Sequence, residues 1–198
     1  MNLDLLHFLK TYVGAFSLVT MGIPLLVIGL RGIVTKKPVF IPTRRQQLFA
    51  AILILPLVVD QLSYWWVPVL YIFSVIFLVI VTRGYSILGV TNESLRAGLS
   101  NSLTRLNLQY EDSSDGFRLP TLGTNLKTNT WGASGALRMK QRRFDTILHS
   151  IVREMKEYYQ SSNEIEVKMG LFISYFALGV VGALAALLLA WFPSVSRV

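Results

Sequence analysis

Asp60 is the one charged residue in a long apolar tract that runs from Gln46 to Thr82. A carboxylate is costly to bury in a bilayer, so a charge inside a membrane span is a candidate functional group, for example in a transport pathway. Gln61 and Ser63 follow Asp60 closely, and three polar residues together are typical of a turn. We therefore expect Asp60 to lie at the tip of a hairpin between two spans, with a pathway role as the alternative.

The other candidates for chemistry are scattered along the chain. Cysteine is absent, which excludes disulfides, thiolate nucleophiles and cysteine-based metal sites. Glu111, Asp112 and Asp115 could ligate a hard cation, but the stretch lacks the spacing of an EF-hand loop and its distal glutamate. We predict a solvated turn at this stretch, no metal site and no catalytic residue, and the sequence leaves cofactor binding open.

Two further features are interpreted as structural and not as functional. The run Gly132-Ala133-Ser134-Gly135 matches neither a nucleophile elbow nor a phosphate-binding loop, and we predict a hairpin turn. His149 falls on the polar face of a predicted helix and should be a solvated surface residue. His7 lies on the other side of the membrane in the topology derived below, so the two histidines cannot share a metal.

The composition indicates a membrane protein. Hydrophobic residues make up 53% of the 198 residues and charged residues only 15%, against roughly 25% charged residues in an ordinary soluble domain. The apolar residues are clustered into long runs. A helix of about 20 apolar residues crosses a hydrocarbon core of ~30 Å, so these runs predict transmembrane helices.

Four spans follow from the apolar runs. The tract from residue 46 to residue 82 would be ~55 Å long as one helix, so we expect it to fold in half. Trp65 and Trp66 then lie where an aromatic belt is expected. The N-terminal membrane region is predicted at residues 1–82, with spans at about 12–30, 46–63 and 65–82. The cytosolic domain follows at residues 83–168, the fourth span at 169–192 and a short tail at 193–198.

Basic residues orient these spans. The loop after the first span carries five of them and no acid, so it supplies +5 of the net charge of +8: Arg31, Lys36, Lys37, Arg44 and Arg45. The positive-inside rule therefore predicts both termini outside and residues 83–168 on the cytosolic side of a plasma membrane or another energy-converting membrane. We expect the basic loop to attract anionic lipid headgroups, and we expect no nucleic acid partner.

The cytosolic segment has the pattern of a small α+β domain. Tyr85–Val90 reads as a strand, and Thr91 or Asn92 is a suitable N-cap for a helix that carries leucine at positions 95, 99, 103 and 106. Strands are predicted on both sides of the 132–135 turn. From Phe144 to Tyr159 the apolar residues follow helical spacing closely, which predicts a second amphipathic helix on the same sheet.

Small residues form a stripe on the fourth span, where they allow helix backbones to approach closely. This stripe packs either against a partner or second copy, or within the chain's own bundle, in which the glycines of the first span are suitable neighbours. The predicted helix-packing residues are Gly170, Ser174, Gly179, Gly182, Ala183 and Ala186.

The sequence thus predicts an integral membrane protein with four transmembrane helices and a small cytosolic α+β domain between helices 3 and 4. The leading functional hypothesis is a non-enzymatic accessory, scaffold or assembly subunit of a larger membrane complex, which docks through its cytosolic domain. The alternative is a small transporter or permease component with Asp60 in the pathway. A membrane enzyme would need clustered acids or a His/Ser pair at one membrane face, and the sequence supplies neither.

Overall fold

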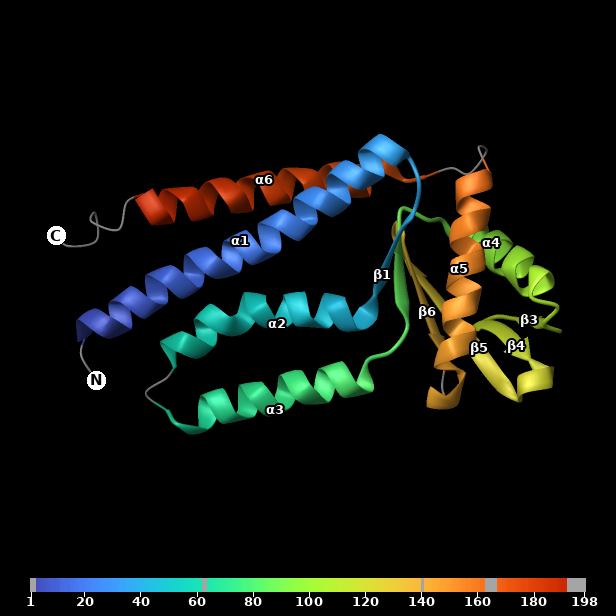
Figure 1. The fold of residues 1–198 in the computed structure, drawn as a ribbon, viewed down its shortest axis with the longest axis horizontal. Coiled ribbons are helices and arrows are strands. Elements are labelled where there is room, and N and C mark those ends of the chain that lie inside the picture. The colour runs from blue at the N-terminus through green and yellow to red at the C-terminus, as the bar shows by residue number, and fades with distance from the viewer. Residues whose placement is uncertain (1–2, 62–63, 140, 163–166, 192–198) are drawn as a thin grey trace. The chain divides into compact units, whose positions relative to one another are not determined.

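A computed structural model describes residues 3–61, 64–139, 141–162 and 167–191 (Figure 1). These residues form six α-helices, six strands and two short 3-10 turns at Pro120–Leu122 and Arg142–Phe144. The helices are α1 (Leu3–Thr35), α2 (Thr43–Asp60), α3 (Trp66–Val81), α4 (Asn92–Arg105), α5 (Asp145–Ser161) and α6 (Met169–Trp191). The strands are β1 (Val39–Pro42), β2 (Tyr85–Leu88), β3 (Glu111–Ser113), β4 (Gly116–Leu119), β5 (Thr124–Trp131) and β6 (Ser134–Met139).

The chain divides into two compact units. A helical unit consists of residues 1–30, 44–82 and 173–198, and an α+β unit consists of residues 31–43 and 83–172. The α+β unit therefore includes β1, which lies in the segment that the sequence analysis treated as a basic loop. Strand pairing recruits this segment, because β1 pairs with β2 along its whole length.

The prediction of a four-span helical membrane protein is wrong. In the described part of the chain, two helices are long and apolar enough to cross a membrane, at Phe16–Thr35 in α1 and Met169–Leu188 in α6. The uncharged part of α2 begins only after Arg45 and is ~21 Å long, and α3 is ~24 Å long, so both are shorter than a hydrocarbon core of ~30 Å. The fold is a mixed α+β fold with six helices and a six-stranded antiparallel sheet among the described residues.

The sheet has the strand order β1-β2-β6-β5-β4-β3, and every neighbouring pair is antiparallel. Strands β3 to β6 form a meander, which brings β6 back against β2. The register assigns each residue to one of the two faces. Phe40, Ile87 and Gly135 share one face, and Ile41, Ser86 and Ala136 share the other.

Both helices of the α+β unit cover the same face of the sheet (Figure 1). Leu95 of α4 packs against Gly135, and Tyr159 of α5 packs against Phe40. Gly98 lets the two helices approach, since a Cβ there would lie 2.9 Å from the Tyr159 hydroxyl oxygen. The fully buried side chains of this core include Ile87, Leu95, Leu99, Leu103, Leu119, Leu126, Leu137, Ile151, Met155 and Tyr159.

Several predicted elements of this unit are confirmed. Thr91 caps α4, with Ser94 completing a capping box, and the predicted apolar face of α5 is the buried one. The solvated turn predicted around Glu111, Asp112 and Asp115 is confirmed at Ser114 and Asp115 but not before them, because Glu111–Ser113 forms strand β3 against β4. Pro120 ends β4, as its missing N–H requires.

Gly116 is a position where only glycine fits. Its φ is +137°, and a Cβ would lie 2.8 Å from the backbone nitrogen of Thr128. Gly123 also has a positive φ of +59° but has nothing within 4 Å of a Cβ. We expect Gly116→Ala to destabilise the α+β unit by more than the ~1–2 kcal/mol that a left-handed alanine costs at position 123. Hydrogen exchange of β4 and β5 in the detergent-solubilised chain compares Gly116→Ala with Gly123→Ala. An equal loss of protection in the two variants would contradict the prediction.

Tyr159 should make stability fall at alkaline pH. Its buried hydroxyl donates to the Ser94 carbonyl oxygen at 2.7 Å, and burial raises its pKa well above the ordinary value. The folded state therefore keeps a proton that the unfolded chain releases above about pH 10, so this stabilisation is present below pH 10 and is lost as pH rises further. Tyr159→Phe should lose about 1 kcal/mol at neutral pH and show a shallower alkaline decline in thermal unfolding. An unchanged decline would contradict this assignment.

Candidate functional site

The candidate site lies at a free stretch of strand edge in the α+β unit. The ladder between β4 and β5 ends at the pair Gly116–Lys127, followed by one bond of 3.0 Å from the Thr128 N–H to the Asp115 carbonyl oxygen. Strand β5 nevertheless continues to Trp131, paired only with β6. The last residues of β5 therefore have a neighbouring strand on one side and none on the other.

The direction of the free backbone groups follows from this bond. Backbone groups alternate sides along a strand, so the carbonyl of Thr128 and both the N–H and the carbonyl of Thr130 point the same way as the Thr128 N–H, away from β6. No hydrogen bond joins these three groups to another residue in the described part of the chain. One donor and two acceptors thus lie in a row on the free edge.

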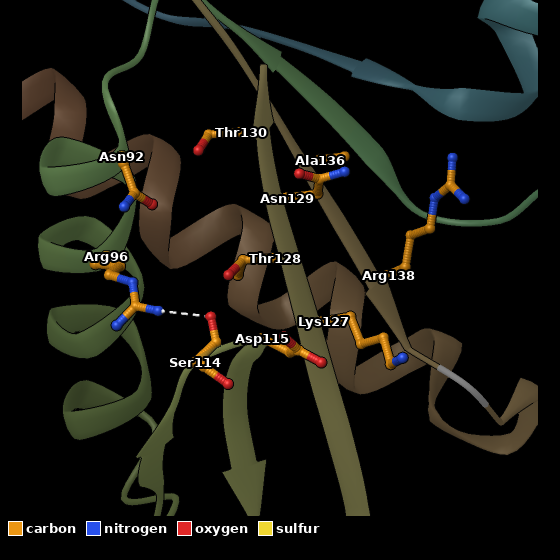
Figure 2. Close-up of a pocket in the computed structure, with 10 residues that line it drawn as sticks. All are labelled: Asn92, Arg96, Ser114, Asp115, Lys127, Thr128, Asn129, Thr130, Ala136 and Arg138. Atoms are coloured by element: carbon orange, nitrogen blue, oxygen red, sulfur yellow. Dashed lines mark hydrogen bonds between the residues drawn. The ribbon is translucent and has the colours of Figure 1, made fainter. Parts of the chain in front are cut away.

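A cavity of about 570 Å³ surrounds this edge (Figure 2). We call it the β5-edge cleft. The start of α4 forms one wall, the turn between β3 and β4 forms the floor, and β5 and β6 form the other wall. Its lining residues are Asn92, Arg96, Ser114, Asp115, Lys127, Thr128, Asn129, Thr130, Ala136 and Arg138.

Two cations occupy directly opposite positions on neighbouring strands of the cleft. Lys127 of β5 and Arg138 of β6 are direct register partners on the sheet face opposite the helices, and both are exposed. Like charges at directly opposite positions destabilise a sheet. No ion pair or hydrogen bond joins either side chain to another described residue, whereas the nearby Arg118 lies 3.7 Å from Glu111. Asp115 is the one acid among the lining residues, and Asp112 balances Arg96, so the cleft keeps a small excess of positive charge from Lys127 and Arg138.

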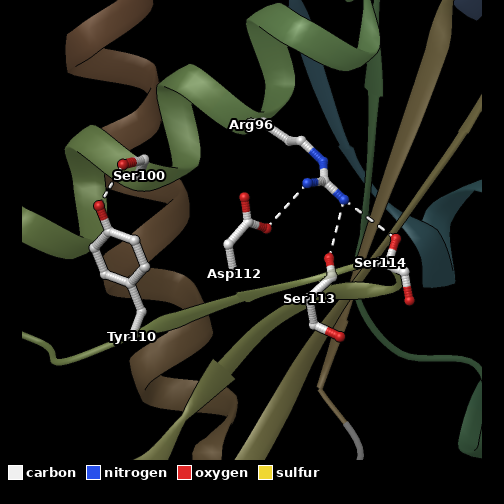
Figure 3. A network of polar contacts seen from close by, with 6 residues as sticks. All are labelled: Arg96, Ser100, Tyr110, Asp112, Ser113 and Ser114. Atoms are coloured by element: carbon white, nitrogen blue, oxygen red, sulfur yellow. Dashed lines mark hydrogen bonds and ion pairs between the residues drawn. The ribbon is translucent and has the colours of Figure 1, made fainter.

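Arg96 fixes the floor of the cleft (Figure 3). Its Nη1 donates to Asp112 Oδ1 at 2.9 Å, and its Nη2 donates to the carbonyl oxygens of Ser113 and Ser114 at 3.0 and 3.1 Å. The guanidinium thereby ties the β3–β4 turn to α4. Because Asp112 already balances its charge, Arg96 shapes the cleft more than it adds to its potential.

A second contact between α4 and the β3 region holds α4, one wall of the cleft, in place (Figure 3). The hydroxyls of Ser100 and Tyr110 are hydrogen-bonded, and the Tyr110 ring packs edge-on against Phe117. The hydrogen bond with Ser100 lowers the pKa of Tyr110 below its ordinary value. Two polar links thus hold α4 beside the end of the meander.

The small residues of α6 lie against α1 within the helical unit. A Cβ at Gly179 would lie 2.6 Å from the Leu26 nitrogen and 2.9 Å from the Gly22 oxygen, so the two backbones are close together. Gly182 also faces Gly22, whose own Cβ would lie 3.3 Å from the Ala183 nitrogen. Of the other predicted packing residues, Ala186 is buried, Gly170 has open space around a Cβ, and Ser174 has an interaction partner.

The remaining predicted residues are spread over both units. Asp60 is the last residue of α2, and the surroundings of its side chain are outside the described part of the structure. Lys37 does not simply face solvent, because its Nζ donates to the carbonyl oxygens of Gln160 and Ser162 at the end of α5. Exposed residues among the predicted lipid-binding cations are Arg31, Lys36, Arg44 and Arg45.

Two of the three acids considered in the sequence analysis and the histidine contact other side chains, whereas Asp115 lines the β5-edge cleft. Asp112 binds Arg96 and Glu111 lies near Arg118, so these two carboxylates belong to ion pairs. Within the described residues no cluster of three or more acids or histidines could hold a metal ion. His149 is exposed, but its Nδ1 is hydrogen-bonded to the Tyr85 hydroxyl and its ring contacts the Tyr85 ring edge-on.

Sequence reasoning missed the pairing of Lys127 with Arg138. The signal was the length of the hairpin turn, since a two-residue turn at Gly132-Ala133 places Trp131 opposite Ser134 and hence Lys127 opposite Arg138. The predicted four-residue turn shifts this register by two residues. Comparisons with known proteins find no matching family model, no matching curated protein and no matching solved structure.

Lys127→Glu should stabilise the folded protein. The variant replaces a like-charge pair by an opposite-charge pair with Arg138, which is worth roughly 0.2–1 kcal/mol at a directly opposite position. The double variant Lys127→Glu/Arg138→Glu restores a like-charge pair and should return to about the wild-type stability. Thermal unfolding of the three detergent-solubilised chains at low salt measures this order, and a destabilised single variant would contradict the pairing.

Proposed function

We propose that this chain is a non-enzymatic, membrane-anchored accessory subunit that docks a partner protein in the β5-edge cleft. The unneutralised pair Lys127 and Arg138 beside a free strand edge carries the proposal. The cleft supplies cations, one carboxylate, amides, hydroxyls and backbone groups, which are groups that bind a partner. Residue pairs that cost a fold stability, such as two like charges at opposite positions of a sheet, are commonly found at functional sites.

The proposed anchors are α1 and α6, whose apolar segments have mean hydropathies of 1.9 and 2.3. Two spans place both termini on the same side. Lys36 and Lys37 follow the first span, Arg31 lies in its last turns, and Lys168 precedes the second span. The positive-inside rule therefore favours the α+β unit on the cytosolic side and both termini outside. The exposed Arg31, Lys36, Arg44 and Arg45 are available to anionic headgroups of a plasma membrane or another energy-converting membrane.

Mild-detergent extraction of the tagged chain, followed by native-gel sizing and mass spectrometry, tests the proposal. We expect the 22.3 kDa chain to migrate with defined partner proteins. The variant Lys127→Glu/Arg138→Glu should remain in the membrane fraction and lose those partners. Two carboxylates replace the two cations of its cleft, and they repel the partner surface that the wild-type cations attract.

Arg153→Glu is the control for charge reversal outside the cleft, with half the charge change of the double variant. Arg153 is exposed on α5, and its nearest acid, Glu154, is 4.0 Å away. This variant makes the same kind of charge change outside the cleft and should keep the partners. A wild-type chain that migrates alone would contradict the accessory role, and a double variant that keeps its partners would contradict the assignment of docking to the cleft.

A further inference from the structure

We propose that the β5-edge cleft binds an extended acidic segment of a partner protein, which adds to the sheet as a strand along the free edge of β5. This inference rests on the proposed docking function and names the chemistry of the ligand.

The free backbone groups match an added strand. An extended peptide offers N–H donors and carbonyl acceptors in alternation, and the edge offers the Thr130 N–H together with the carbonyls of Thr128 and Thr130. About two or three backbone hydrogen bonds can form in this way. The edge from Thr128 to Trp131 is about four residues or ~13 Å long, so a short segment occupies it.

The side chains of the cleft specify acidic residues. Successive side chains of an added strand point to opposite faces of the sheet. On the face opposite the helices, such side chains lie beside Asn129, with Lys127 two residues along β5 and Arg138 across β5 on β6, so long acidic side chains are needed to reach the two cations. On the helix face they lie beside Thr130 and Thr128, toward Asn92. Carboxylates on the first face neutralise the two cations, which lack an acidic partner among the described residues.

The same geometry disfavours a phosphate or a lipid headgroup. Two of the three free edge groups are carbonyl oxygens, which repel an anion placed against the edge and attract a peptide N–H. An anion without donors would leave both carbonyls unpaired once it excluded water from them. Charge alone therefore does not account for the row of edge groups, whereas an acidic peptide uses both the charge and the backbone.

The exposed Trp131 extends the surface beyond the edge. It ends β5 on the same face as Lys127, and 86% of its surface is accessible. The hairpin tip is held in place by a hydrogen bond of 2.8 Å from the Gly89 N–H to the Ala133 carbonyl oxygen. An exposed aromatic side chain at the end of the edge gives the added segment an apolar contact.

Fluorescence anisotropy at low salt tests the inference, with three labelled heptapeptides that are each added to the detergent-solubilised chain of 198 residues. The first alternates valine with glutamate, the second is the same peptide methylated on alternate backbone nitrogens, and the third alternates valine with lysine. We expect the acidic peptide to bind and the lysine peptide not to bind. N-methylation should weaken binding at least about tenfold, because it removes backbone donors.

The charge-reversed variant Lys127→Glu/Arg138→Glu supplies the matched control. It keeps the edge and should bind the lysine peptide in place of the acidic one. Hydrogen exchange should show added protection of the Thr130 amide with the acidic peptide and the wild-type chain.

Equal binding of the methylated and unmethylated peptides would overturn strand addition, and so would displacement of the peptide by vesicles of anionic lipid with no change at Thr130. Absence of peptide binding in a chain that co-purifies with partners would refute this inference and leave the proposed function in place. Peptide binding by a chain that has no co-purifying partner would support the inference and contradict the accessory role.

Discussion

The two-residue turn at Gly132-Ala133 is the constraint on which the site depends. Gly132 adopts a φ of +61°, which glycine reaches without strain, and this allows β5 and β6 to pair from Trp131 and Ser134 onward. A shift by two residues would separate Lys127 from Arg138. A shift by one residue would put Lys127 and Arg138 on opposite faces of the sheet, with one of the two charges under the helices. The turn thus fixes both the charge pair and the direction of the free edge groups.

Packing on the helix face explains why the other groups remain available. The two helices bury one face of the sheet, with Leu95 against Gly135 and Tyr159 against Phe40. At the end of the sheet with β1 and β2, Val39 and Leu88 are also buried on the second face. The second face is polar and exposed only toward β5, where Lys127 and Asn129 lie. The cleft is therefore found where the apolar residues of the sheet end.

The sequence predicts those elements whose signals are local. Periodicity predicts α4 and α5, and a suitable N-cap residue predicts the start of α4, since side-chain spacing and the cap are properties of a single segment. Strands β1 and β3 were missed because Val39–Pro42 follows a basic run and every residue of Glu111–Ser113 is exposed, so pairing rather than composition defines them. The four-span prediction was wrong because apolar content does not determine where a helix begins and ends. Arg44 and Arg45 occupy the first turn of α2, and α3 starts only at Trp66. The cleft could not be predicted, since it combines a register, an early strand end and the start of a distant helix.

The cations beside the free edge also bear on self-association. An unpaired strand edge is a template for pairing with a second copy of the same chain, and proteins commonly protect such edges with lysine or other charges. Two copies that met edge to edge here would bring Lys127 and Arg138 of both chains together, and this repulsion opposes the pairing. The same two charges attract an acidic strand. A single pair of side chains therefore both disfavours pairing between identical chains and favours an acidic partner, which is a physical reason for a folded protein to retain a like-charge pair that costs it stability.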